Sequence, residues 1–198
     1  MMTMIRTFIA IDLPDQAHTA LADLQHRLKA IAPPRMIRWI ATENIHLTLH
    51  FLGDIAPRDV DKAAGALQAA ATTCPPFSLE LTGLGCFPHT RRPRIIWAGV
   101  AGEIEPLVNL HRELGQQLKV IDFTPEDRPY APHLTIGRVK PGLPPYQLSQ
   151  LGEVLEQARL EVKHLAGMEV NQICLFQSDL RPTGPLYTRL AQAMLKSP

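Results

Sequence analysis

The tripeptide His-Leu-Thr occurs twice in this chain, in IHLTLHFL at residues 45–52 and in HLTIGRV at residues 133–139. Both stretches are rich in apolar and β-branched residues, and this composition predicts that each forms a β-strand. Their histidines, His46 and His133, lie 87 positions apart. A motif repeated at such a long spacing indicates that the chain contains two related halves.

The polar residues of both motifs are expected on a single face of their strands. Side chains alternate along a strand, so His46, Thr48 and His50 should share one face. In the second strand His133 and Thr135 should do the same. A strand buried on both faces is apolar on both, so these polar faces predict a groove.

The elements predicted around the two motifs follow the same order. In the first half we expect strands at 6–13, 45–52 and 77–84, and helices at 17–31 and 57–71. In the second half we expect strands at 94–100, 133–139 and 168–176, helices at 104–118 and 151–158, and a last strand at 186–190. Each half therefore reads β-α-β-α-β, and Ile96 corresponds to Ile9 at the same 87-residue spacing.

The repeat predicts the architecture as well as the elements. We expect an α+β fold of two lobes, related by a pseudo-twofold axis, with a cleft between them where the two motifs meet. The lobes should correspond to residues 5–88 and 93–190. Because each half is small for a core of its own, we expect them to pack as a single domain over residues 1–198.

Composition and charge exclude several classes of protein. With 198 residues, 45% hydrophobic and 20% charged, the chain is globular rather than disordered. A net charge of +1 argues against a protein that coats long nucleic acids by charge. Three cysteines without CxxC spacing indicate neither a disulfide framework nor a cysteine zinc site. Without an apolar run of ~20 residues, we expect a soluble, cytoplasmic monomer that is not bound to a membrane.

Two imidazoles that face each other across a cleft can perform acid–base chemistry near neutral pH. The threonine hydroxyls beside them are suited to donating hydrogen bonds to an anion. This combination suits displacement at a phosphodiester without a metal. A zinc site of His46, His50 and His133 is disfavoured, because residues four apart on a strand lie ~13 Å apart. One motif alone would be read as structural, and the pairing is what favours function.

The sequence resembles the 2H phosphoesterase superfamily, which is defined by two His-x-Thr-x motifs. More closely, it is similar to the LigT-like RNA 2′,3′-cyclic phosphodiesterases, also called 2′-5′ RNA ligases. The stretches that carry this resemblance are RTFIAIDLP (6–14), RWIATENIHLTLHFLGD (38–54), GCFP (85–88), PRIIWAGV (93–100), RPYAPHLTIGRVK (128–140) and LFQSDLRPTGPLYTRL (175–190). Their order and spacing cover nearly the whole chain.

The resemblance implies hydrolysis of RNA 2′,3′-cyclic phosphodiester ends, tRNA fragments among them, to 2′-phosphomonoesters without a cofactor. It implies that His46 is the proton donor and His133 the proton acceptor, while Thr48 and Thr135 bind the phosphate. Pseudo-symmetry leaves the sequence itself silent on which histidine is the acid. The reverse reaction would join RNA ends through a 2′-5′ linkage.

Two further residues are candidate substrate contacts. Strict alternation points Arg138 away from the cleft, but a bulge near Gly137 would turn it inward, toward the phosphate. The alternative for Arg138 is a structural salt bridge. Tyr130 either stacks on a terminal base or anchors a buried loop.

Other residues have plainer expected roles. Trp97 is expected in the core, and the run that contains Arg91, Arg92 and Arg94 in a solvated turn. The remaining histidines lack a paired motif and should be surface or structural residues: His18, His26, His89, His111 and His164.

Two alternatives to RNA-end hydrolysis stay open. One is a binding module for RNA ends or nucleotides without catalysis. The other is a 2H phosphodiesterase that acts on a small cyclic nucleotide phosphate.

Overall fold

The computed structural model describes residues 4–124, 129–182 and 184–196. The strands are β1 (Ile5–Ile11), β2 (Ile37–Trp39), β3 (Leu47–Ile55), β4 (Phe77–Phe87), β5 (Ile95–Gly102), β6 (His133–Val139), β7 (His164–Val170), β8 (Gln172–Arg181) and β9 (Gly184–Met194). The helices are α1 (Asp15–Ile31), α2 (Val60–Ala71), α3 (Ile104–Val120) and α4 (Pro145–Glu161), with short 3-10 turns at Thr42–Asn44 and Pro57–Asp59.

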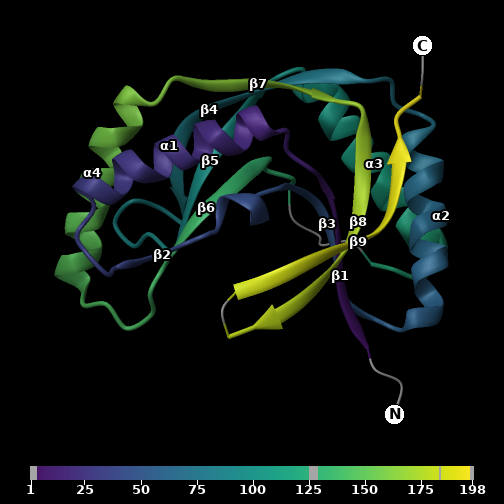
Figure 1. The fold of residues 1–198 in the computed structure, drawn as a ribbon, viewed down its shortest axis with the longest axis horizontal. Helices are drawn as coiled ribbons and strands as arrows, with labels where there is room; N and C mark the ends of the chain where they lie inside the picture. Colours follow the sequence, from purple (N-terminus) through teal and green to yellow (C-terminus); the bar gives the residue numbers. More distant parts are fainter. Residues whose placement is uncertain (1–3, 125–128, 183, 197–198) are drawn as a thin grey trace.

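The strands form two antiparallel sheets, with the orders β3-β1-β8-β9 and β2-β6-β5-β4-β7. Helices α1 and α4 lie beside the five-stranded sheet, and α2 and α3 lie on the other side of the molecule (Figure 1). Each helix directs an apolar stripe at the sheets, as the sequence predicts; in α1 the buried residues include Ala17, Leu21 and Leu28. The predicted α+β class is confirmed.

The prediction that residues 5–88 and 93–190 each form a lobe is wrong, because the halves exchange their third strands. β4 from the first half pairs with β5, and β8 from the second half pairs with β1. The order β3-β1-β8 in one sheet thus matches β6-β5-β4 in the other. Each exchange covers an edge of β1 or β5 that would otherwise expose its backbone groups. A single domain over residues 1–198 stays a prediction.

The predicted strand at 168–176 is two strands in different sheets. β7 ends at Val170 in the five-stranded sheet, and β8 begins at Gln172 in the four-stranded one. Figure 1 shows the chain turning from β7 into β8 as it passes between the sheets. The sequence conceals this crossing because Asn171, the one residue between the two strands, is not a Gly or Pro that would signal a break.

The 87-residue register extends to irregularities of the two motif strands. Leu49 is an extra residue in β3, opposite the step from Ile9 to Ala10 in β1. Ile136 is the extra residue in β6, opposite the step from Ile96 to Trp97 in β5. The two β-bulges are therefore at equivalent positions of the repeat, and each reverses the side-chain alternation beyond it.

The main hydrophobic core draws on both sheets and all four helices. It includes Ile9 of β1 together with one residue from each helix: Leu21, Leu67, Leu110 and Leu151. A smaller buried cluster of Phe8, Ala10, Cys174 and Phe176 occupies the opposite face of the four-stranded sheet. Among the described residues, no helix has the length and apolarity needed to cross a membrane.

Candidate active site

His46 lies directly before β3, and its ring is held by the preceding turn. Its Nδ1 atom is 3.0 Å from the carbonyl oxygen of Asn44. Because a carbonyl can only accept, Nδ1 carries the hydrogen, and the neutral ring has its lone pair on Nε2. Phe8 stacks on the ring with centroids 4.5 Å apart, and Tyr187 meets it edge-on at 5.2 Å.

His133 is the first residue of β6, and its ring is held in the same way. Its Nδ1 atom is 2.8 Å from the carbonyl oxygen of Ala131, again two residues earlier. Phe87 contacts the ring edge-on, with centroids 5.0 Å apart. The two histidines therefore have the same tautomer when neutral, and Nε2 is in both cases the atom that can exchange a proton.

The bulge at Leu49 overturns one predicted placement. Beyond it, Phe51 pairs with Phe8, and His50 pairs with Ile9 of the core. His50 is therefore 5% exposed and does not share the face of His46 and Thr48. The prediction from strict alternation is wrong because the extra residue reverses the phase of the strand.

The β3 bulge removes His50 from the face of Thr48, whereas the equivalent bulge in β6 brings Arg138 onto the face of Thr135. Thr135 pairs with Trp97, and Arg138 pairs with Ile95 two residues along β5. The expected bulge is thus present, one residue before Gly137. Among the described residues Arg138 forms no ion pair, so the salt-bridge alternative finds no support. Phosphate binding by Arg138 stays a prediction.

Tyr130 has the role of the loop anchor rather than of an open stacking surface. Its ring stacks on His111 with centroids 3.9 Å apart. Its hydroxyl donates to the backbone oxygen of Thr48 at 3.1 Å. Burial raises the pKa of the Tyr130 hydroxyl, which is thus a donor at neutral pH. The ring face that contacts His111 is not available to a base.

Residues from both halves approach one another at this point of the molecule. The hydrogen bond from the Tyr130 hydroxyl to the backbone oxygen of Thr48 joins the segment before β6 to strand β3. Strands β3 and β6 also contact each other. Arg138 also acts on the first motif's surroundings: burial raises the pKa of the Tyr187 hydroxyl, while the charges of Arg138 and Arg6 lower it. Tyr187 in turn contacts His46.

A recess of about 160 Å³ lies beside His46. It is lined by Phe8, Phe176 and Tyr187 and by the acidic residues Asp12 and Glu43. The recess has aromatic walls and acceptor groups, which is a combination that suits a planar ring with polar edges.

Burial dominates the electrostatics of His46. It lowers the pKa of the ring to about 4, and the bond to Asn44 and the charge of Asp12 offset this only in part. The ring is therefore neutral at pH 7 in the protein without substrate. A negatively charged group bound beside it would raise this pKa.

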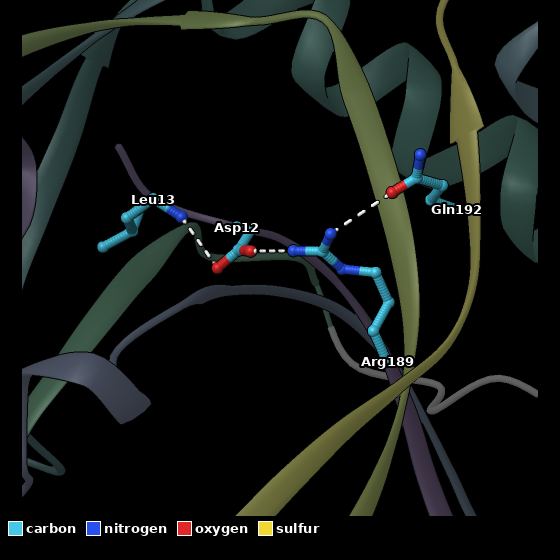
Figure 2. A network of polar contacts seen from close by, with 4 residues as sticks. All are labelled: Asp12, Leu13, Arg189 and Gln192. Atoms are coloured by element: carbon cyan, nitrogen blue, oxygen red, sulfur yellow. Dashed lines mark hydrogen bonds and ion pairs between the residues drawn. The ribbon is translucent and has the colours of Figure 1, made fainter. Parts of the chain in front are cut away.

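Asp12 is fixed by a polar network that sequence reasoning missed. Its Oδ2 atom is 2.5 Å from Nη2 of Arg189, and its Oδ1 accepts the backbone N–H of Leu13 at 3.2 Å (Figure 2). Arg189 also donates to Oε1 of Gln192 at 3.2 Å and lies over the Phe176 ring. Asp12 and Arg189 both belong to stretches that carry the family resemblance, and this was the available signal.

Two minor expectations are also resolved. Trp97 is only partly buried and faces the side of Thr135, where its ring covers Gly85 and contacts Phe87, so its placement in the core is wrong. The arginine run lies in the connection from β4 to β5, as the turn alternative predicts.

In the described part of the chain, no group of three or more His, Cys, Asp or Glu side chains is placed to hold a metal ion.

Paired His-x-Thr strands on two interlocked sheets define a phosphoesterase of the two-histidine class. The chain belongs to the family described as LigT-like phosphoesterases, which it matches over residues 11–97 and 99–187.

Known relatives agree with this assignment over nearly the full length. The chain is 32% identical to the RNA 2′,3′-cyclic phosphodiesterase of Methanothermobacter thermautotrophicus, over 93% of this chain and 95% of that protein. It is 31% identical to the protein of the same name from Thermotoga maritima, over 97% and 96%.

Solved structures share the fold. The protein TT0787 of Thermus thermophilus has a TM-score of 0.78 at 26% identity, covering 98% of this chain and 99% of that one. Escherichia coli LigT complexed with 3′-AMP has a TM-score of 0.73 at 24% identity, over 97% and 98%.

Proposed function

We propose that this protein hydrolyses RNA 2′,3′-cyclic phosphodiester ends to 2′-phosphomonoesters. The observation that carries the proposal is the matched anchoring of His46 and His133, whose Nδ1 atoms are both bonded to the backbone oxygen two residues earlier. Two preoriented imidazoles suit the two proton transfers of this reaction. The relatives named above are RNA 2′,3′-cyclic phosphodiesterases, which supports this class of substrate.

The proposed reaction is a displacement at phosphorus. His133 Nε2 takes a proton from water, whose oxygen forms the new bond to phosphorus. The bond from phosphorus to O3′ breaks, and His46 Nε2 gives its proton to that oxygen. The product retains the phosphate on O2′ and has a free 3′-hydroxyl, so atoms and charge balance. Thr48 and Thr135 donate to the non-bridging oxygens, and Arg138 adds a positive charge.

The donor role of His46 requires the substrate itself. With a pKa of about 4, the ring is mostly unprotonated at neutral pH before binding. The anionic phosphodiester favours the imidazolium form and raises the pKa when it binds. The negative charge of the bound substrate thus favours the protonated form of His46, which burial otherwise disfavours.

The same site also determines the class of substrate and a second reaction. The substrate is an RNA 3′ end with a cyclic phosphate, tRNA fragments included, and the protein acts as a monomer without a metal. When a 5′-hydroxyl takes the place of the water, the same groups can join it to a cyclic end through a 2′-5′ linkage: His133 takes the proton of the 5′-hydroxyl, and His46 again protonates O3′ as its bond to phosphorus breaks. By microscopic reversibility, cleavage of that linkage by the 3′-hydroxyl uses His46 as the base and His133 as the acid.

The decisive experiment is incubation with an oligoribonucleotide that has a 2′,3′-cyclic end, in the presence of EDTA, followed by identification of the monoester by 31P NMR. We expect a 2′-phosphate. A 3′-phosphate would show that O2′, and not O3′, is the leaving oxygen, which would contradict the proposed step. Binding without turnover would favour the non-catalytic module, and hydrolysis of mononucleotide cyclic phosphates alone would favour the small-substrate alternative. A parallel preparation of His133→Ala controls for contaminating nucleases.

A further inference from the structure

We propose that His111 and Tyr130 are positioning residues that hold the Thr48 strand and the His133 segment at the separation which the reaction requires. The inference rests on the proposed function, since it concerns the same site. It goes beyond that function because neither residue is needed for the proton transfers or contacts the reacting atoms in the proposed mechanism.

Three aromatic rings from three different elements form one stack. The rings of His50 in β3 and His111 in α3 have centroids 4.1 Å apart and an interplanar angle of 18°. The rings of His111 and Tyr130 are 3.9 Å apart at 11°. His111 therefore lies between the other two, and the stack connects β3, helix α3 and the segment that leads into β6.

The β-bulge in β3 makes this stack possible. Without the extra residue Leu49, strand alternation would place His50 on the face of Thr48. In the structure its Nε2 lies 2.9 Å from the backbone oxygen of His111. A carbonyl can only accept, so His50 donates this bond and is tied to the helix backbone. The base of the stack is thus fixed to both β3 and α3.

The far end of the stack is fixed to the first motif. The Tyr130 hydroxyl donates to the backbone oxygen of Thr48, in the edge strand of its sheet. Thr48 is two residues after His46, and Tyr130 is three residues before His133. This hydrogen bond therefore connects the first His-x-Thr motif to the segment beside the second. Stacking on His111 holds the Tyr130 ring in the orientation in which its hydroxyl reaches Thr48.

A clamp of this kind acts on turnover more than on binding. Either half of the site can hold a phosphate oxygen with its own threonine, whereas the transition state needs both histidines aligned at once. A contact that matters only in the transition state lowers kcat when it is lost and leaves KM nearly unchanged. Burial and the neighbouring His50 also lower the pKa of His111 to about 4, so the central ring of the stack is uncharged at neutral pH.

The test uses variants that separate the hydroxyl from the ring. Tyr130→Phe removes only the bond to Thr48, and we expect kcat on an oligoribonucleotide cyclic phosphate to fall about tenfold, with KM within twofold. His111→Leu removes the aromatic surface and should lower kcat at least as much, while His111→Phe should restore it. The matched control is Tyr146→Phe, since this tyrosine is 70% exposed on α4.

The outcomes separate this proposal from the proposed function. If the unaltered protein hydrolyses the substrate but Tyr130→Phe retains full kcat, the positioning role is overturned and the function stands. A loss of melting temperature in Tyr130→Phe and His111→Leu with unchanged kcat means a purely structural role and also overturns it. If His111→Leu does not fold, the kcat values of Tyr130→Phe and His111→Phe still test the positioning role. Failure of the unaltered protein on every cyclic phosphate contradicts the proposed function instead.

Discussion

At the scale of single residues, His46 and His133 have equal anchoring but different surroundings. His46 is packed against both Phe8 and Tyr187, whereas His133 contacts only Phe87 among the aromatic rings of the described residues. Burial accordingly lowers the pKa of His46 to about 4. Residues equivalent by the repeat thus have environments suited to different parts of an acid–base reaction.

Replacement of either histidine tests the acid–base proposal. We expect His46→Ala and His133→Ala each to lower turnover by roughly two to four decades, as for lost acid–base groups. Stopped assays on a cyclic-ended oligoribonucleotide measure the effect, with circular dichroism to verify the fold. His164→Ala is the control, because this ring lies exposed at the start of β7. Full activity in either variant would reject the mechanism.

Asp12 offers a test of which histidine is the acid. Its charge raises the pKa of His46, so Asp12→Asn should lower that pKa further and reduce the imidazolium fraction at pH 7. If His46 is the donor, kcat/KM falls severalfold. The exposed Asp15→Asn at the start of α1 is the matched control. An unchanged kcat/KM for Asp12→Asn would instead favour His46 as the acceptor, because its neutral form already predominates at pH 7.

At the scale of elements, the paired bulges decide which side chains reach the site. In β3 the bulge sends His50 toward α3, and in β6 it turns Arg138 toward the face of Thr135. The residue beside Arg138, Gly137, leaves room for β2: a Cβ there would lie 2.8 Å from Cγ2 of Ile37 and 3.3 Å from the Trp39 ring. The sequence pattern shows the strands, but alternation alone cannot locate an extra residue.

Gly137→Ala should therefore displace β2 from the end of β6. We expect the free energy of unfolding to fall by about 1–3 kcal/mol, as for other overpacked sites. Urea denaturation measures this, and kcat should fall as Arg138 shifts. The control is Gly167→Ala in β7, where a Cβ would meet nothing within 4 Å. Equal stability of the two variants would contradict the packing argument.

At the scale of the whole molecule, two partly buried histidines couple stability to pH. His46 and His111 each have a pKa lowered from 6.5 to about 4. Between these values the unfolded chain binds more protons than the folded one, so stability is lost as pH falls from about 6.5 to about 4. Both groups are neutral above this window, where their contribution is fully present.

Unfolding at pH 5 should consequently take up about two protons through these residues. Urea denaturation at several pH values gives the uptake as the slope of the unfolding free energy against pH. In His111→Phe, which keeps an aromatic ring but cannot titrate, the slope should decrease by about one proton. An unchanged slope would show that His111 does not titrate in this range.

The repeat, the paired motifs and most helices and strands follow from the sequence, because alternation and helical periodicity are local properties of the chain. The 87-residue spacing even locates equivalent positions that the structure confirms to be bulged. The family resemblance supplied the order of motifs that includes Asp12 and Arg189, although not the ion pair between them.

Tertiary structure alone decided three features: the exchange of β4 and β8 between sheets, the reversed faces beyond Leu49 and Ile136, and the stack of His50, His111 and Tyr130. Each depends on contacts between residues far apart in the chain. Local periodicity predicts that a strand forms and which way it faces at first, whereas its partner and its bulges are set by the backbone hydrogen bonds and packing of other elements.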